Sequence, residues 1–364
     1  MAYNVTAIVG ARPNYMKVAP IWRALDGRDD VTRTLVHTGQ HYDENMSKIF
    51  FDDLQLPRPD VYLGVGSGPH GAQTGRVMTE LEVVFGKNRP DILIVVGDVN
   101  STMAGALAAV KMGIPVAHVE AGLRSFDREM PEEINRMVTD VVSDLLFTTS
   151  KEAEPNLLRE GVDIEKIHFV GNVMIDSLDF YRPMAEQSQI LGQVGVEKSR
   201  YGLVTLHRPT NVDDPSVLKG VLGALEKIGE TCPLVFPVHP RTRNMMKENK
   251  IEVTESRIKI LNPIGYLDFV KLMMNARIVL TDSGGIQEET TVLGIPCLTI
   301  RENTERPVTV EIGTNRLVGM NPDRIVDEGV KILGGDVPPG KIPERWDGKA
   351  APRIVQVLDE YGNE

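Results

Sequence analysis

Short apolar runs of strand length alternate with helical patterns along the whole chain. In the first half they read VTAIVG, RTLVHTG, DILIVVGD, IPVAHVEAG, DLLFTTS and IHFVGN, and in the second half YGLVTLHRP, PLVFPVHP, RIKILNP, RIVLTDSGG, IPCLTI and NRLVG. Near-continuous Val, Ile and Leu runs bounded by Gly and Pro are typical of strands that helices cover on both faces. The pattern therefore predicts an α/β protein built from βαβ units with parallel sheets.

The length of 364 residues favours two doubly wound domains in series over one very large sheet. The stretch RPMAEQSQILGQVGVEKSR, which follows the sixth predicted strand, is polar and has no strand pattern. We therefore predict a first domain over residues 1–172 and a second over residues 173–350. In open parallel sheets the ligand lies beyond the carboxyl ends of the strands, so these ends are where chemistry is expected.

Carboxylates collect at these positions in the first half. Asp98 ends one apolar strand and Glu120 ends the next, while Glu132 lies in the first turn of the helix PEEINRMVTDVV. Two of them have a structural alternative: Asp98 as a turn or cap residue, and Glu132 as a partner of Arg136 or of the helix dipole. Three carboxylates facing one cleft would raise one another's pKa, which suits acid and base chemistry near neutrality.

Cationic and glycine-rich segments mark the other strand ends. Arg12 and Lys17 flank the start of the first helix and could neutralise a diphosphate or form solvent-exposed ion pairs. His207 and His239 end two strands of the second half. In LTDSGGIQEE, glycines at a helix start allow close approach of an anion, and a glutamate one turn on suits a ribose hydroxyl; an ordinary strand-to-helix turn is the alternative.

Composition restricts the function further. Forty Lys and Arg against 51 Asp and Glu give a net charge of −11, which argues against non-specific binding to nucleic acid or an anionic membrane. The two cysteines lie far apart without metal-ligand spacing, and no apolar run is long enough to cross a bilayer. The amino-terminal residues lack the pattern of a signal peptide, so the cytoplasm is the expected location.

The order of motifs resembles that of the non-hydrolysing UDP-N-acetylglucosamine 2-epimerases. The matching segments are GARPNYMKVAP, GDVNST, HVEAGLR, PEEINR, GNVMID, LHRPTN, PVHP, LTDSGGIQEE and ENTERP. The resemblance implies two Rossmann-like domains in a GT-B arrangement, with the active site in the interdomain cleft and a helix over residues 351–364 crossing back to the first domain. It also implies a homodimer without metal or other cofactor. The implied reaction inverts C2 of UDP-GlcNAc through elimination and re-addition of UDP, and it supplies cell-surface polysaccharide synthesis.

The resemblance also implies roles for individual residues. The catalytic set is Asp98, Glu120, Glu132 and His207, without individual acid and base assignments. The residues expected to contact the UDP-sugar are Arg12, Lys17, Phe269, Ser283, Gly284, Gly285, Glu289 and Arg306. A possible second nucleotide site comprises Gln40, Arg208 and His239.

Three alternatives share these features. A hydrolysing relative would release ManNAc and UDP from the same intermediate. A related 2-epimerase acts on a diacetamido-uronic acid sugar nucleotide, and its loop style is similar to GQHYDENMSKIFFDDL and LRSFDREMPEE in this chain. A GT-B glycosyltransferase would use the same nucleotide cradle with a separate acceptor.

Overall fold

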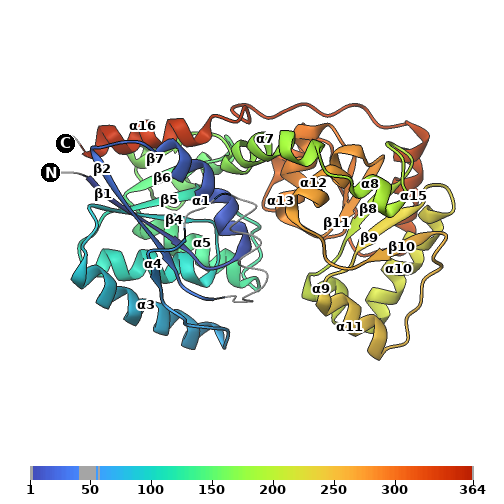
Figure 1. Cartoon of the computed structure of the whole chain (residues 1–364), viewed down its shortest axis with the longest axis horizontal. Coiled ribbons are helices and arrows are strands. Elements are labelled where there is room, and N and C mark those ends of the chain that lie inside the picture. Colours follow the sequence, from blue (N-terminus) through green and yellow to red (C-terminus); the bar gives the residue numbers. More distant parts are fainter. Residues whose placement is uncertain (1–2, 41–54, 56–57, 363–364) are drawn as a thin grey trace. The chain divides into compact units, whose positions relative to one another are not determined.

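The computed structural model describes residues 3–40, 55 and 58–362. The chain divides into two compact units. The first comprises Met1–Asp179 together with Glu344–Glu364, and the second comprises Phe180–Pro343. Each unit is built around its own parallel sheet, which confirms the predicted fold class of two Rossmann-like domains (Figure 1).

The sheet of the first unit has the order β3-β2-β1-β4-β5-β6-β7, with all neighbours parallel. The order reverses between β1 and β4, and such a reversal marks the ligand-binding edge of a doubly wound sheet. All five residues of the central strand β4 are buried, as a strand covered on both faces requires. The strands are β1 (Tyr3–Val9), β2 (Val31–His37), β3 (Val61–Tyr62), β4 (Ile92–Val96), β5 (Val116–Ala121), β6 (Leu145–Thr148) and β7 (Ile167–Phe169).

Helices cover both faces of this sheet. In Figure 1, α3 and α4 lie on one side, and α1 with the carboxyl-terminal helix α16 lies on the other. Asp176 accepts hydrogen bonds from the backbone N–H groups of Ala350 and Ala351, so α16 is anchored to this unit at its first turn. The helices are α1 (Arg12–Ala24), α3 (His70–Lys87), α4 (Asn100–Lys111), α5 (Pro131–Val142), α6 (Ala153–Arg159), the 3-10 turn Ile164–Lys166, α7 (Val173–Glu186) and α16 (Ala350–Gly362).

The sheet of the second unit has the order β10-β9-β8-β11-β12-β13 and is also parallel. Its strands are β8 (Gly202–Thr205), β9 (Leu234–Pro237), β10 (Ile258–Leu261), β11 (Ile278–Thr281), β12 (Cys297–Thr299) and β13 (Asn315–Leu317). Its helices are α8 (Ile190–Val194), α9 (Pro209–Val212), α10 (Pro215–Gly229), α11 (Pro240–Glu248), α12 (Tyr266–Asn275), α13 (Gly284–Leu293), α14 (Pro307–Glu311) and α15 (Pro322–Gly334). The order reverses between β8 and β11, so the loops after these two strands form its ligand-binding edge.

Twelve predicted strands are confirmed, and the sequence pattern missed β3, which has only two half-buried or exposed residues. Helix α5 departs from expectation in another way. Its apolar residues recur at helical spacing, and such a stripe normally marks the face that packs on the core; the residues are Ile134, Met137, Val138, Val141 and Val142. Instead, Glu133, Arg136 and Asp140 are buried, whereas Val141 is 65% exposed. Within the described residues no helix is both long and apolar enough to span a membrane.

Candidate active site

Asp98 follows β4 at the carboxyl edge of the first sheet and is held by a buried arginine. Arg136 donates two hydrogen bonds to Asp98 Oδ2, from Nε at 3.1 Å and from Nη2 at 2.7 Å. The same guanidinium donates from Nη1 to Glu133 at 2.7 Å. The alternative role of Glu132 as a partner of Arg136 is therefore not found among the described residues, because Arg136 contacts Asp98 and Glu133 instead. These charge-assisted contacts fix the orientation of the Asp98 carboxylate.

Glu120 lies near the end of β5 in a strained conformation. Its φ is +74°, a region that costs a non-glycine residue about 1–3 kcal/mol, and the register with β6 shifts between Val119 and Ala121. Such irregularities re-aim side chains next to functional sites. The Glu120 side chain is 2% exposed and accepts a hydrogen bond from Lys17 Nζ at 2.8 Å. Lys17 comes from α1, so this contact links two of the predicted site residues.

Lys17 reaches Glu120 by passing close to the backbone before Asp98. A Cβ placed on Gly97 would lie 2.6 Å from Lys17 Nζ, and Gly97 has a φ of +66°. Both facts require glycine at this position. The turn that carries Asp98 and the Lys17–Glu120 ion pair are thus packed directly together.

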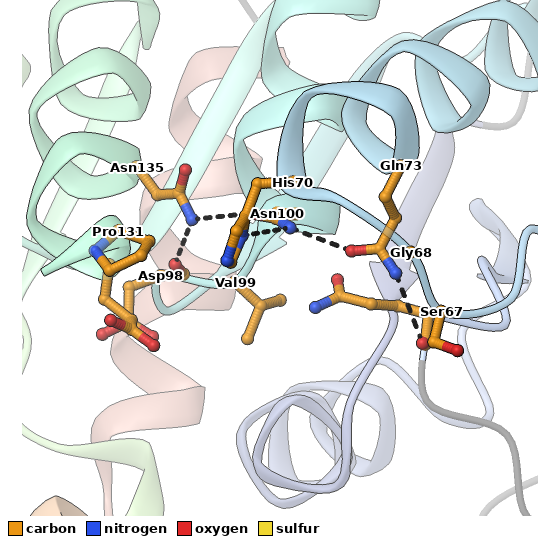
Figure 2. Close-up of a pocket in the computed structure, with 11 residues that line it drawn as sticks. Ser67, Gly68, His70, Gln73, Asp98, Val99, Asn100, Pro131 and Asn135 are labelled. Atoms are coloured by element: carbon orange, nitrogen blue, oxygen red, sulfur yellow. Dashed lines mark hydrogen bonds between the residues drawn. The ribbon is translucent and has the colours of Figure 1, made fainter. Parts of the chain in front are cut away.

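Glu132 and Asp98 line a cavity of about 290 Å³ in the first unit (Figure 2). No partner of the Glu132 carboxylate is found among the described residues, which sets it apart from the paired Asp98 and Glu120. Gln40, predicted for a second nucleotide site, lines the same cavity, and its Oε1 accepts hydrogen bonds from the Ser101 backbone N–H and hydroxyl at 3.0 and 2.6 Å.

One wall of this cavity is a chain of hydrogen-bonded amide and imidazole side chains. Asn135 donates to Asn100 Oδ1 at 3.2 Å and to the Asp98 carbonyl at 2.8 Å. Asn100 in turn donates to Gln73 Oε1 at 2.9 Å and lies 3.0 Å from His70 Nδ1. Figure 2 shows these contacts running across the cavity from Asn135 to Gln73. Amides and an imidazole can donate to and accept from sugar hydroxyl and acetamido groups.

In the second unit, His207 follows β8 and is oriented by Asp282, which follows β11. The His207 Nδ1 atom lies 2.9 Å from Asp282 Oδ1, and Asp282 Oδ2 accepts the backbone N–H groups of His207 and Arg208 at 2.9 and 2.8 Å. Burial raises the pKa of the Asp282 carboxyl, but the contacts with His207 and the backbone outweigh it, so the pKa is lowered overall. Because Asp282 engages Nδ1, the Nε2 atom of the 44% exposed His207 is left for a ligand.

His239 lies beside His207, with ring centroids 5.9 Å apart. Its Nδ1 accepts the backbone N–H of Arg241 at the start of α11. Burial lowers the pKa of His239, and the charges of His207 and Arg241 lower it further. Arg208, also predicted for the second nucleotide site, lies 3.8 Å from the buried Glu305.

The predicted phosphate cradle forms the start of α13. Ser283 is the extended residue at the helix N-cap, and Gly284 and Gly285 are the first helical residues. A Cβ on Gly284 would lie 2.7 Å from Arg306 Nη1, so Gly284 allows the arginine to pack beneath the turn. Arg306 is 6% exposed and contacts Glu288 and Glu305 at 2.7 and 2.6 Å. Its guanidinium therefore supports the turn from inside the protein, whereas its predicted nucleotide contact stays a prediction.

The remaining nucleotide candidates lie on α12 and α13. Glu289 is 4% exposed, and its Oε1 accepts the hydroxyl of Tyr266 at 2.8 Å. Phe269, one turn along α12 from Tyr266, is partly exposed. Arg12 is the first residue of α1, but its side chain lies outside the described part of the structure.

The sequence alone gave no role to Asp282 and offered Glu132, not Glu133, as the alternative partner of Arg136. Asp282 could have been found because it directly follows β11, the strand beside β8, which His207 follows. For Arg136, the spacing of three from Glu133 allows a helical pair just as the spacing of four from Glu132 does. Among the described residues no cluster of three or more His, Cys, Asp or Glu side chains could hold a metal ion.

One Rossmann-like unit carries carboxylates at its strand ends, and the other carries a glycine-rich helix start and an oriented histidine. Together these features define the class of the protein as a nucleotide-sugar enzyme. The model of the UDP-N-acetylglucosamine 2-epimerase family matches residues 23–359. The UDP-N-acetylglucosamine 2-epimerase of Methanocaldococcus jannaschii is 45% identical over 368 residues, covering 99% of each chain. The UDP-2,3-diacetamido-2,3-dideoxy-D-glucuronate 2-epimerase of Pseudomonas aeruginosa is 41% identical over 359 residues, covering 98% of this chain and 99% of that one.

A solved structure also matches nearly the whole of this chain. The crystal structure of the Methanocaldococcus jannaschii UDP-GlcNAc 2-epimerase in complex with UDP-GlcNAc and UDP superposes with a TM-score of 0.91 at 44% identity, covering 98% of this chain and 99% of that chain. The chain therefore belongs to the UDP-N-acetylglucosamine 2-epimerase family, which confirms the resemblance seen in the motifs. Members of this family are isomerases.

Proposed function

We propose that the protein interconverts UDP-N-acetylglucosamine and UDP-N-acetylmannosamine without hydrolysing them. A carboxylate takes the C2 proton, the C1–O bond breaks with its electron pair leaving on UDP, and a C1=C2 double bond forms. A second carboxyl group, in its protonated form, then gives its proton to C2 from the opposite face, and a β-phosphate oxygen of UDP adds back to C1. Atoms and charge balance without an oxidant or a metal in the scheme, and the product would feed polysaccharide synthesis.

The cavity bordered by Asp98 and Glu132 is the observation that carries the proposal. Proton transfer on both faces of one carbon needs at least two acid–base groups close to it. Asp98, Glu120 and Glu132 supply these groups in the proposal. Arg136 orients Asp98 and Lys17 orients Glu120, whereas Glu132 lines the cavity without a partner in the described residues.

The nucleotide contacts are assigned to the glycine-rich turn and its surroundings. The backbone N–H groups at Ser283, Gly284 and Gly285 suit a diphosphate, because a helix N-terminus attracts anions. Arg12, Lys17 and His207 would stabilise the UDP as it leaves. Lys17 can serve Glu120 and a phosphate oxygen together, since an ammonium group has three N–H donors.

The character of the cavity favours N-acetylglucosamine over a diacetamido-uronic acid. The described residues that line it include neither lysine nor arginine, and its wall from Asn135 to Gln73 is made of amides and the His70 imidazole. A C6 carboxylate buried there would face no lysine or arginine and would lie near the carboxylates of Asp98 and Glu132, which is costly. We therefore assign UDP-GlcNAc as the substrate, and the diacetamido-uronate nucleotide is the comparison to include in the assay.

Proton NMR of UDP-GlcNAc with the purified protein in D2O tests the reaction. We expect UDP-ManNAc to appear with deuterium at C2, and the same spectrum with the uronate nucleotide to change much more slowly. Free ManNAc with UDP would instead show a hydrolysing enzyme. Proton transfer at C2 would be refuted if UDP-GlcNAc took up no deuterium after long incubation although the same sample bound UDP in calorimetry.

Single variants then assign the carboxylates. Asp98→Asn, Glu120→Gln and Glu132→Gln are each measured for deuterium uptake at C2, starting once from each sugar nucleotide. The residue that removes the C2 proton of one epimer also delivers the proton when that same epimer is re-formed, and the second residue serves the other epimer. Loss of either residue should therefore abolish exchange from one starting epimer more than from the other. Unchanged turnover in all three variants would contradict the proposed catalytic set.

We further propose a homodimer in the cytoplasm. The outward stripe of α5 supports the dimer, since Val141 is 65% exposed and Ile134, Met137 and Val138 are only partly buried. Light scattering of Val141→Asp is expected to give the monomer mass, whereas Val330→Asp, at a 52% exposed site on α15, leaves the dimer intact. A dimer that persists in Val141→Asp would rule out this face.

A further inference from the structure

Asp140, on the buried face of α5, contacts the backbone after Glu120. Its side chain has no exposed surface. One oxygen lies 2.6 Å from His118 Nδ1, and the other accepts the backbone N–H of Gly122 at 3.1 Å and a contact from Arg124 at 2.7 Å. Gly122 comes two residues after Glu120 in the chain. Asp140 therefore holds the turn from which Glu120 projects.

His118 links Asp140 to the turn that precedes Asp98. Its Nε2 atom lies 2.9 Å from the carbonyl oxygen of Gly97, the residue before Asp98. Each ring nitrogen of His118 therefore faces an acceptor, the Asp140 carboxylate on one side and the Gly97 carbonyl on the other. Arg124 also pairs with Glu160 at 2.6 Å, so its guanidinium bridges the carboxylates of Asp140 and Glu160. The pKa of Asp140 is raised by burial but lowered more by His118 and Arg124, which keeps it ionised.

The turn that carries Glu120 needs such support because its backbone is strained at a non-glycine residue. Gly97 and Gly122 have φ angles of +66° and +78°, and Glu120 between them in sequence has +74°. A non-glycine residue holds this conformation only when its surroundings enforce it. The chain of contacts Gly97–His118–Asp140–Gly122 joins the two turns through one buried pair, and neither His118 nor Asp140 lines the cavity.

We propose that His118 and Asp140 are positioning residues that fix the separation of Asp98 and Glu120 for proton transfer at C2. The inference rests on the catalytic roles proposed above for these two carboxylates. Its physical reason is that a displacement of about 1 Å of a reacting group can cost about a hundredfold in rate. A purely structural role for the pair would lower stability without a specific effect on the chemical step.

Three variants separate the two roles. Asp140→Asn removes the carboxylate charge that faces His118 Nδ1. His118→Asn keeps a donor near the Nδ1 position, toward Asp140, but cannot reach Gly97, whereas His118→Gln places a donor near the Nε2 position, toward Gly97. Leu81→Ala, at a fully buried site of α3 in an apolar cluster that includes neither His118 nor Asp140, serves as the control that lowers stability.

The assay measures kcat, KM and deuterium uptake at C2, with thermal unfolding of every variant. We expect kcat and deuterium uptake to fall at least about tenfold in Asp140→Asn and His118→Asn with KM within about threefold, as for an interaction needed in the transition state. His118→Gln should recover most of the loss seen in His118→Asn. Leu81→Ala should keep kcat, and UDP binding by calorimetry should be unchanged throughout.

The same assay on Asp98→Asn and Glu120→Gln separates failure of this inference from failure of the proposed function. If those two variants keep full turnover, the proposed catalytic roles are wrong and the positioning inference is wrong with them. If they lose turnover while folded His118→Asn keeps it, the positioning inference alone is wrong. The positioning inference is also overturned if His118→Asn and His118→Gln are equally active and both match Leu81→Ala. If Asp140→Asn does not fold, His118→Asn alone decides the outcome.

Discussion

Replacing Gly97 with alanine perturbs the Lys17–Glu120 pair without changing either charged residue. The new Cβ would lie 2.6 Å from Lys17 Nζ, so the ammonium must move by roughly 1 Å to reach ordinary contact distance. Lys17 and Glu120 are 6% and 2% exposed, so no solvent compensates a stretched ion pair. The backbone also carries a φ of +66°, which costs alanine about 1–2 kcal/mol.

The expected loss of stability has a lower and an upper limit. The conformational cost alone gives about 1–2 kcal/mol, and complete loss of a buried pair by removal of one partner costs about 3–5 kcal/mol. Since the pair is stretched rather than removed, we expect a total between about 2 and 5 kcal/mol. Turnover should fall about a hundredfold, because Glu120 and the turn that carries Asp98 both shift.

Gly161→Ala is the matched control for this substitution. Gly161 has a φ of +85° in the same unit, and a Cβ there would meet nothing within 4 Å. Gly161→Ala should lower the free energy of unfolding by only the conformational cost of about 1–2 kcal/mol and keep full turnover. Urea unfolding and the C2 deuterium assay compare the two. The reasoning is refuted if Gly97→Ala loses no more stability than Gly161→Ala and turns over equally fast.

Three further predictions follow from the same contacts. Burial lowers the pKa of His37 to about 4, so the free energy of unfolding is full at pH 7 and falls as the pH drops from about 6.5 to 4, where the buried imidazole must take up a proton. In chemical unfolding, His37→Phe should lose about 3 kcal/mol less of this free energy over the same pH range than the wild type does. Gly284→Ala should displace Arg306 beneath the phosphate cradle and weaken UDP binding in calorimetry by at least about tenfold, and unchanged affinity would contradict the cradle. Arg136→Lys keeps the charge but loses the two-pronged contact with Asp98, so kcat should fall about tenfold with KM little changed.

The sequence determined the arrangement of elements and the family. Apolar runs bounded by Gly and Pro located twelve strands, because burial on both faces of a parallel sheet leaves a local compositional signal. Asp98, Glu120 and His207 were singled out as site candidates by their position at the ends of predicted strands, because the ligand-binding edge of such a sheet follows from its topology. Both inferences rest on properties of short segments, which an amino-acid sequence displays directly.

Only the tertiary structure decided which groups hold these residues in place. The apolar stripe of α5 predicted a buried apolar face, yet the polar side with Arg136 and Asp140 is buried, because partners from distant segments satisfy its charges. The φ of Glu120 and the contact of Asp282 with His207 are likewise set by neighbours far along the chain. Ion pairs between distant residues depend on distances that packing fixes to within tenths of an ångström, and no local pattern in a sequence records them.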